Sequence, residues 1–451
     1  MHLLAHGIVG RADLPIPEFW VAVAAAIVLA LSFVALALGW TRPKLAGLPR
    51  RGLFRLPLAL EVVCGAIGVF VFFVVVYAGV AGTDAQSQNL APTAVYVGFW
   101  IGIPFLSLLF GDVFRLLNPW RALGRATGWV AARISSELPE PLEYPERLGR
   151  IPAAIGLFGF AICELCWADA TQPGPLALLM LVYFVVMLVG MSLYGVEPWV
   201  RNADAFGVLF GLIGSLAPLG RGEDGRIELR VPGTGAPRID PIAGTGVLLV
   251  ISVGSTAFDG AKEGPLFNDI VQELQSAFGS LGFSLGTSLE LGFLVGLVVA
   301  IVVVAAIWTL GLAGMSLPPS VPDRRALARA FAHTLIPISA GYMVAHYFSL
   351  LAYNGQNLWP LANDPLGKGS DLFGGAAAGI DYGIVSATGI WYIQITALVV
   401  GHIAGLVLAH DRALEVYGSA RAATRSQVVM LILMLCFTLL GLWLLSAALN
   451  T

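Results

Sequence analysis

The chain has 451 residues, of which 57% are hydrophobic and only 12% charged, whereas about a quarter of the residues of a soluble domain carry a charge. This composition excludes a soluble enzyme. The formal charge of -3 comes without any basic run, which excludes nucleic acid as a partner. The apolar residues fall into blocks of about 20, the length of helix that crosses a hydrocarbon core of ~30 Å. We therefore expect an all-α, polytopic membrane helix bundle that forms one integral membrane domain over 1–451.

The apolar blocks predict about ten transmembrane helices, because a backbone inside lipid must satisfy its hydrogen bonds internally. The predicted ranges are 19–40, 56–80, 94–111, 151–169, 176–196, 242–258, 289–315, 331–353, 389–411 and 427–448. The first block is too long for the apolar part of a signal peptide, so we interpret it as a retained helix. Small-residue spacings such as Gly401-x-x-x-Gly405 predict close packing between helices.

The distribution of positive charge predicts the orientation of the bundle. With the N-terminus outside, 22 of the 25 lysines and arginines fall in the five inner connections, as the positive-inside rule requires. Arg11, Lys262 and Lys368 are the exceptions. The outer connections carry many acidic residues instead, so the outer face would attract cations. Both termini are therefore expected outside.

Three connecting segments have patterns of their own. Residues 112–150 contain an amphipathic stretch with several arginines, which predicts a helix on the inner membrane surface. Residues 197–241 begin with an apolar stretch that includes Asp204, which predicts a re-entrant or interfacial helix followed by a loop. Residues 354–388 predict a long outer loop of the kind that forms lids or binding loops. Its second half is expected to dip into the membrane and to leave a broken helix before Gly389.

Four of the six histidines lie in the eighth and ninth predicted spans. Ionisable side chains at membrane depth are costly, so each is a candidate for function. A rise of about 1.5 Å per residue places His346 and His402 near mid-membrane, and His333 and His410 at the inner rim. If the two helices are neighbours, His346 pairs with His402, and His333 pairs with His410.

Two acidic residues lie at membrane depths similar to those of the mid-membrane histidines: Glu164 in the fourth span and Asp259 in the sixth. Two imidazoles and a carboxylate are a common ligand set for a transition metal such as Zn, Cu or Fe. A metal-bound water with its pKa lowered towards about 7 would be a nucleophile, and a second carboxylate could act as a general base. This pattern predicts that His346 and His402, with Glu164 or Asp259, bind a metal that activates water for the hydrolysis of a hydrophobic ester. Glu164 and Asp259 are the candidate catalytic residues.

The remaining histidines are candidate metal ligands as well. His333 and His410 would form a second pair at the inner rim. His2 and His6 are four residues apart near the outer N-terminus, and together with Asp13 they could hold a cation.

Three alternatives stay open. Each histidine could simply donate to a backbone carbonyl or a hydroxyl on a neighbouring helix. The same column of histidines and acids could relay protons or a cation in a transporter or channel. A single haem could lie between two histidines, whereas two haems do not fit, because His333 and His346 are thirteen residues apart and His402 and His410 only eight. The expected partners are the lipid bilayer and a small hydrophobic molecule or a cation.

Several short stretches resemble a group of bacterial multi-pass membrane proteins labelled fenitrothion hydrolase. The stretches are Ala5-His6-Gly7, Ala345-His346-Tyr347-Phe348, Asp381-Tyr382-Gly383, Gly401-His402 and Ala409-His410-Asp411-Arg412. The resemblance extends over most of the chain. It implies an organophosphate ester hydrolase in the bacterial inner membrane, and it implies that His6 is a copper-type ligand near the N-terminus.

Overall fold

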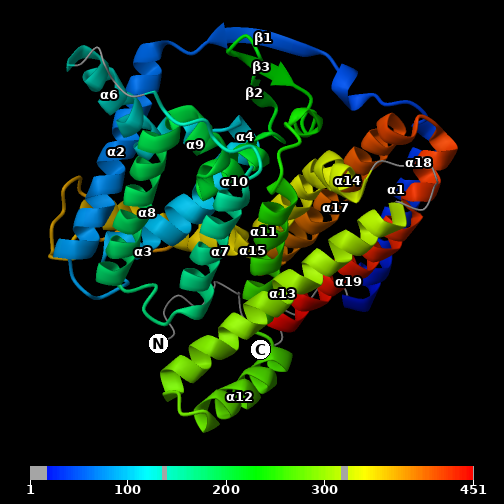
Figure 1. The fold of residues 1–451 in the computed structure, drawn as a ribbon. Helices are drawn as coiled ribbons and strands as arrows, with labels where there is room; N and C mark the ends of the chain where they lie inside the picture. The colour runs from blue at the N-terminus through cyan, green and yellow to red at the C-terminus, as the bar shows by residue number, and fades with distance from the viewer. Residues whose placement is uncertain (1–17, 135–139, 316–322, 450–451) are drawn as a thin grey trace.

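A computed structural model of the protein describes residues 18–134, 140–315 and 323–449, and these are mostly helical (Figure 1). The α-helices are α1 (Glu18–Gly39), α2 (Leu58–Ala81), α3 (Leu90–Thr93), α4 (Ile103–Phe110), α5 (Phe114–Leu117), α6 (Pro119–Ile134), α7 (Ile151–Cys166), α8 (Pro173–Tyr194), α9 (Val196–Asn202), α10 (Ala205–Gly214), α11 (Thr245–Ala261), α12 (Pro265–Ser280), α13 (Leu285–Met315), α14 (Arg324–Phe331), α15 (Ile336–Asn354), α16 (Leu358–Asn363), α17 (Ala387–Tyr417), α18 (Ala420–Ser426) and α19 (Val428–Leu449). Shorter elements are the 3₁₀ helices η1 (Leu45–Gly47), η3 (Ala236–Arg238), η4 (Ala332–Leu335) and η5 (Gly355–Asn357), the π-helical η2 (Ala94–Gly102), and the strands β1 (Arg50–Arg55), β2 (Leu219–Arg221) and β3 (Arg226–Arg230).

Seven helical segments of the described chain are long and apolar enough to cross a membrane. These segments are Phe19–Gly39, Leu58–Ala81, Leu90–Phe110, Pro173–Tyr194, Leu285–Met315, Arg324–Asn363 and Ala387–Tyr417. The pair α18 and α19, bent by 41°, makes an eighth if it is counted as one span. Every predicted span contains one of these helices or one of α7 and α11, which have only 16 and 17 residues. The protein is therefore a polytopic helical membrane protein, and a count of ten stays a prediction that depends on α7 and α11.

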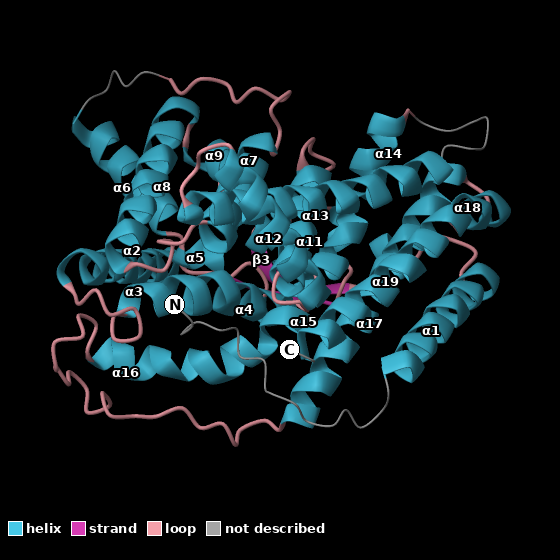
Figure 2. Cartoon of the chain, turned by 90° about the horizontal axis from the view of Figure 1, so that it is seen from below, coloured by secondary structure: helices cyan, strands magenta, loops and turns pink. Residues whose placement is uncertain are grey.

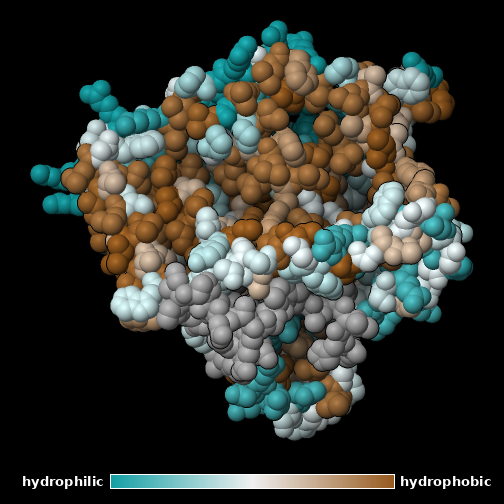
Figure 3. All heavy atoms as spheres, turned by 180° about the vertical axis from the view of Figure 1, so that it is seen from behind, coloured by the Kyte–Doolittle hydropathy of each residue, from teal (hydrophilic) through white to brown (hydrophobic). Residues whose placement is uncertain are grey.

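The surface of the bundle is strongly apolar. Large side chains such as Phe70, Leu178 and Val302 are exposed along the long helices. Figure 3 shows one face on which hydrophobic residues dominate, with hydrophilic residues gathered at the top edge and at the bottom. An exposed apolar surface of this extent indicates contact with lipid.

The five basic connections meet at one end of the bundle, at the top of Figure 1. The joining contacts are the ion pairs Arg50–Glu228 and Arg121–Glu197 and the hydrogen bonds from Lys44 N to Asp411 and from the Tyr417 hydroxyl to the Met315 carbonyl. These contacts tie 42–55, 112–150 and 197–241 to the end of α13 and to the end of α17. The arrangement agrees with the charge pattern, which places all five connections on one side.

A three-stranded antiparallel sheet of order β1-β3-β2 covers this end. The sequence did not predict it, because these strands are short and rich in arginine. Arg50 faces Arg230 and Leu219 faces Leu229 in the sheet register. Arg230 also donates to the carbonyl oxygens of Gly214 and Ala217 at 3.1 and 3.0 Å, so it satisfies the end of α10.

The predicted re-entrant or interfacial segment 197–241 begins as a helical hairpin. The chain reverses at Gly195, whose φ of +82° is left-handed, and α9 runs back along α8, where the Trp199 ring packs directly on Gly190. At Asp204 the chain turns again, and α10 returns to the sheet. The Asp204 carboxylate accepts hydrogen bonds from Asn118, Trp120 and Tyr183 at 2.7 to 2.9 Å, which fixes the tip of the hairpin inside the bundle.

The basic helix α6 packs along the first half of α2. A Cβ on Gly65 would lie 2.8 Å from the Ala122 methyl carbon, and Arg125 pairs with Glu61 at 3.1 Å. The start of α6 is buried and its last two turns are mostly exposed. The amphipathic pattern of 112–150 therefore reflects packing on α2 over the first turns of the helix.

The outer connection 354–388 contains η5 and α16, followed by turns. Asp364 accepts hydrogen bonds from Lys368 N, Gly369 N and the Ser370 hydroxyl, and Asp371 from two further amides. The expected helix break before Gly389 is absent from this described segment. Instead α17 begins at Ala387, is capped by the Ser386 hydroxyl, and continues unbroken to Tyr417. Figure 2 shows this connection as a long loop beside α16.

Candidate functional site

Asp259 is the centre of a buried polar cluster near the C-terminal end of α11. Its Oδ2 atom lies 2.9 Å from His346 Nε2 and accepts a hydrogen bond from the Tyr347 hydroxyl at 2.9 Å. Its Oδ1 atom lies 2.9 Å from Lys262 Nζ. The Asp259 side chain has no exposed surface, while those of His346 and Lys262 are 15% and 13% exposed. The cluster therefore holds a carboxylate away from water and still leaves its two basic partners partly accessible.

Glu164 brings a second carboxylate to this cluster from α7. It lies within electrostatic range of Asp259 and Lys262. Burial alone would lower the pKa of the Lys262 ammonium, but the carboxylates of Asp259, Glu164 and Glu263 raise it above its usual range. The Lys262 ammonium therefore favours its charged form beside the Asp259 carboxylate that it contacts.

The local sequence of α11 explains why Asp259 points inward. Thr245, Ser252 and Asp259 recur every seven residues, and Ser255 and Thr256 lie between them on the same face, so these side chains form one stripe along a helix of 3.6 residues per turn. All five are buried. The Ser252 and Ser339 hydroxyls lie 2.8 Å apart and join α11 to α15. At the inner end, the Thr245 hydroxyl accepts a hydrogen bond from Arg150 at 3.1 Å.

The imidazole of His346 packs beside the glycine that follows Asp259. A Cβ on Gly260 would lie 3.6 Å from His346 Nδ1, an ordinary van der Waals distance, so the ring lies close to the backbone of α11. Tyr347 is the next residue of α15, and its ring packs edge-on against His346 with centroids 4.6 Å apart. Consecutive residues of α15 thus reach the same carboxylate oxygen from two directions.

The predicted neighbouring helices are in close contact. A Cβ on Gly341 of α15 would lie 2.8 Å from the Ala397 carbonyl oxygen, and one on Gly401 of α17 would lie 2.6 Å from the Pro337 carbonyl oxygen. The two helices run antiparallel, so His402 lies at the level of Pro337, near the start of α15. His346 lies five residues after Gly341, towards the other end of α15. His346 and His402 therefore do not pair as predicted. Their depths were calculated from helix ends estimated from the sequence, and these ends gave a wrong register between α15 and α17.

His402 has partners of its own. Its Nδ1 lies 2.8 Å from the Leu398 carbonyl oxygen one turn earlier, and its ring packs between Tyr342 and Phe437. The structure does not bring it to Asp259. This is the arrangement of a buried histidine that bonds the backbone, which was one of the alternatives left open by the sequence.

The inner-rim histidines are also separate from the cluster. His410 Nε2 lies 2.9 Å from the Trp40 carbonyl oxygen, and the adjacent Asp411 accepts hydrogen bonds from Trp40 Nε1 and Lys44 N. His333 is buried in η4 beside Arg412. Both histidines belong to the packing that fixes α1 and α15 to the end of α17.

The described part of the chain gives little support to the predicted metal site. Within it, no three His, Cys, Asp or Glu side chains gather as a metal-binding group. His346 and Asp259 would supply two ligands, but the Lys262 ammonium already lies on the other carboxylate oxygen. His6, with His2 and Asp13, lies outside the described residues.

Sequence reasoning identified Asp259, His346 and Glu164 from their depth but missed Lys262 as their partner. The signal was present: Lys262 follows Asp259 by three residues, which places both on one face of a helix. It was missed because Lys262 was assigned to the outer connection. The hydroxyl stripe of α11 was also missed, since serine and threonine barely change the hydropathy of an apolar block.

No protein-family model, curated protein or solved structure matches this chain. Its composition, apolar helices and buried polar cluster define the class directly: a multi-pass helical membrane protein with an ionisable site within its bundle.

Proposed function

We propose that the protein is a proton-coupled membrane transporter of the bacterial cytoplasmic membrane, with the arginine-rich end facing the cytoplasm. The single observation that carries this proposal is the polar stripe of α11, which runs from Asp259 along one face of the helix to Thr245, the partner of Arg150 at the opposite end. Buried ionisable groups inside membrane helices usually mark ion or proton pathways. A site that only bound a ligand at the outer end would not need this stripe.

The outer cluster supplies the proton-exchanging groups of the proposed pathway. His346 is partly exposed and its ring nitrogen contacts Asp259, so a proton from the outer solution enters at the imidazole and passes to the carboxylate. Lys262 keeps its proton and limits the net charge of the cluster.

The hydroxyls of α11 supply the next steps. A hydroxyl can both donate and accept a hydrogen bond. The Ser252 and Ser339 hydroxyls lie 2.8 Å apart, and the Thr256 hydroxyl, which lies between Ser252 and Asp259 along α11, donates to the Ser252 carbonyl oxygen. About 10 Å of helix separates Ser252 from Thr245, a gap that ordered water between polar side chains would bridge.

Proton flux into sealed proteoliposomes tests this proposal. A pH gradient is imposed and the internal pH is followed with a trapped fluorescent indicator. We expect His346→Gln and Asp259→Asn each to lower the flux by about 100-fold, because a positioned acid–base group contributes at least that factor to proton transfer. Ser252→Ala should lower it less.

Two matched controls accompany these variants. Asp371→Asn removes an exposed carboxylate of the outer loop, and Ser107→Ala removes a buried hydroxyl of α4 away from the stripe. Both should keep the wild-type flux. Equal flux in wild type, His346→Gln and Asp259→Asn would contradict the proposal.

The hydrogen bond between Asp259 and His346 favours a second candidate function, hydrolysis of a hydrophobic ester. A carboxylate that orients an imidazole is the arrangement in which histidine takes a proton from an attacking water and returns it to the leaving alkoxide. The resemblance noted in the sequence points to organophosphate esters. Hydrolysis in detergent without any gradient, lost in His346→Gln, would support this function over transport.

Bound metal and haem stay predictions that one preparation of purified protein can test. Elemental analysis would show whether a transition metal is bound, and an absorption spectrum would show whether a haem is. A metal that is lost in His346→Gln would support the hydrolase, whereas metal-free protein that conducts protons would support the transporter.

A further inference from the structure

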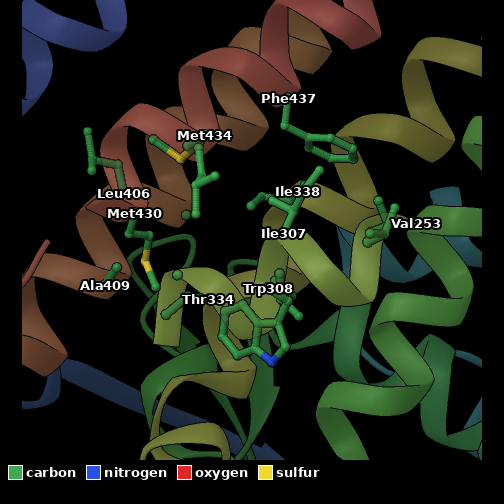
Figure 4. Close-up of a pocket in the computed structure, with 15 residues that line it drawn as sticks. Val253, Ile307, Trp308, Thr334, Ile338, Leu406, Ala409, Met430, Met434 and Phe437 are labelled. Carbon is green, nitrogen blue, oxygen red and sulfur yellow. The ribbon is translucent and has the colours of Figure 1, made fainter. Parts of the chain in front are cut away.

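A second internal feature lies behind the hydroxyl stripe, where helices α11, α13, α15, α17 and α19 enclose a cavity of about 70 Å³. Figure 4 shows side chains from these helices pointing towards it. The lining includes Val253, Trp308, Ile338, Leu406, Met434 and Phe437. One probe sphere the size of a water molecule needs about 10–15 Å³, so the space is several times larger than a packing defect.

The chemistry of the wall disfavours a polar occupant. Apart from the indole nitrogen of Trp308, the polar side-chain group of the lining is the Thr334 hydroxyl, which donates to the Phe331 carbonyl at 2.8 Å. Water in a cavity needs two to four polar partners, so this space does not favour water. Two methionines, Met430 and Met434, face it, and their flexible thioether chains adapt to an apolar occupant.

The position of the cavity indicates which apolar molecule reaches it. α13 and α19 meet tightly at Gly314, where a Cβ would lie 2.5 Å from Val429. Further along, Ile307 and Leu433 are only half-buried, and Val302 and Ile432 are exposed on the outside of the same two helices. Lipid acyl chains are the apolar molecules that surround this surface.

We propose that the cavity binds one acyl chain of a membrane phospholipid, which enters between α13 and α19. The occupant would touch Val253 and Ile338, the residues next to Ser252 and Ser339. It would thus contact both helices that carry the hydrogen-bonded hydroxyl pair. The proposal concerns lipid binding and does not depend on proton transport.

Photocrosslinking with a lipid probe tests this inference. The full-length protein is reconstituted with phosphatidylcholine that carries a diazirine in one acyl chain, irradiated, digested and analysed by mass spectrometry. Met434 and Phe437 are buried, so bulk lipid does not reach them, and we expect label on both. Label at Met434 no higher than at the fully buried Leu248 of α11 would overturn the proposal.

Two variants fill the cavity without adding polarity. Ala409→Leu enlarges a buried lining residue and Ile307→Phe a half-buried one, so at least one should fold. Each should lower the label at Met434 by about tenfold, the effect of 1.4 kcal/mol in binding free energy, while the label at exposed Val302 stays constant. Ala306→Leu, a matched enlargement on the exposed face of α13, should leave both unchanged.

The same assay tests whether the bound acyl chain belongs to a phospholipid or to a free fatty acid. A diazirine fatty acid replaces the phospholipid probe in a second arm. Label at Met434 from phosphatidylcholine supports the proposal, whereas label from the free fatty acid alone would overturn it. Folded variants that retain the full label at Met434 would also overturn it.

Discussion

The carboxylate of Asp259 contacts basic and phenolic groups from α15 and from the end of its own helix. The sequence could identify Asp259 and His346 as candidates because an ionisable residue inside an apolar block is conspicuous. It could not pair them, since depth along a helix says nothing about the direction in which a side chain points. His402 shows the consequence: it shares an apolar helix with other candidates but bonds to its own backbone.

The Lys262–Asp259 contact leads to a prediction about stability. Lys262→Met leaves the Asp259 carboxylate buried without its ammonium partner, and breaking a buried pair on one side typically costs about 3–5 kcal/mol. We expect a clear fall in the unfolding temperature of the detergent-purified protein. Lys368→Met, at an exposed lysine of the outer loop, should leave that temperature unchanged. Equal unfolding temperatures for both variants would show that the ion pair does not form.

The turn around Asp364 gives a prediction about pH. The hydrogen bond from the Ser370 hydroxyl lowers the pKa of the Asp364 carboxyl below its usual value of 3.8. A carboxyl with a lowered folded-state pKa stabilises the fold above the unfolded pKa, and the stabilisation is lost as the pH falls through the folded value. Protection of the amides of Lys368 and Gly369 from hydrogen exchange, corrected for intrinsic rates, should therefore persist at pH 5 and decrease below about pH 4. Asp364→Asn should show low protection already at pH 5; protection equal to wild type would contradict the assignment.

At the scale of elements, hydropathy predicted helices at every expected span, and the small-residue pattern predicted the tight contact between α15 and α17. The sheet at the basic end was not predictable, because strands such as Arg50–Arg55 lack an alternating apolar pattern and pair only through contacts distant in sequence. The break between α9 and α10 was visible as a polar interruption around Asp204. The partners of that carboxylate come from Asn118 between α5 and α6, from α6 and from α8, so only the fold reveals them.

The contact between α15 and α17 can be tested with one methyl group. In Gly401→Ala the new Cβ would lie 2.6 Å from the Pro337 carbonyl oxygen, so the helices must separate, at a cost of about 1–3 kcal/mol in unfolding free energy. Gly159→Ala on α7 is the matched control, because nothing lies within 4 Å of its Cβ. Thermal unfolding should distinguish the two; an unaffected Gly401→Ala protein would argue against the register.

At the scale of the whole molecule, the distribution of charge was the most informative part of the sequence. Ion pairs and hydrogen bonds join four of the basic connections, 42–55, 112–150, 197–241 and 412–426, at one end of the bundle. A wrong assignment of sides would have placed these connections at both ends. The number of spans was less predictable. α7 and α11 have only 16 and 17 residues, fewer than a helix needs to cross a hydrocarbon core of ~30 Å without tilt or flanking residues.

The three lysines of the chain allow a direct test of orientation. In intact spheroplasts, a membrane-impermeant amine reagent should modify exposed Lys368 of the outer loop and leave Lys44 of the basic end unmodified. Permeabilisation should make Lys44, which is also exposed, reactive. Modification of Lys44 in sealed spheroplasts would reverse the proposed orientation.

The central claim is that His346 and Asp259 act as one proton-exchanging unit, and a double-mutant comparison of proton current tests it most directly. The current through the reconstituted protein is measured for wild type, His346→Gln, Asp259→Asn and the double variant. Groups that act as a unit are strongly non-additive, so the double variant should lose no more current than either single variant. Losses that multiply, or currents equal to wild type, would contradict the account.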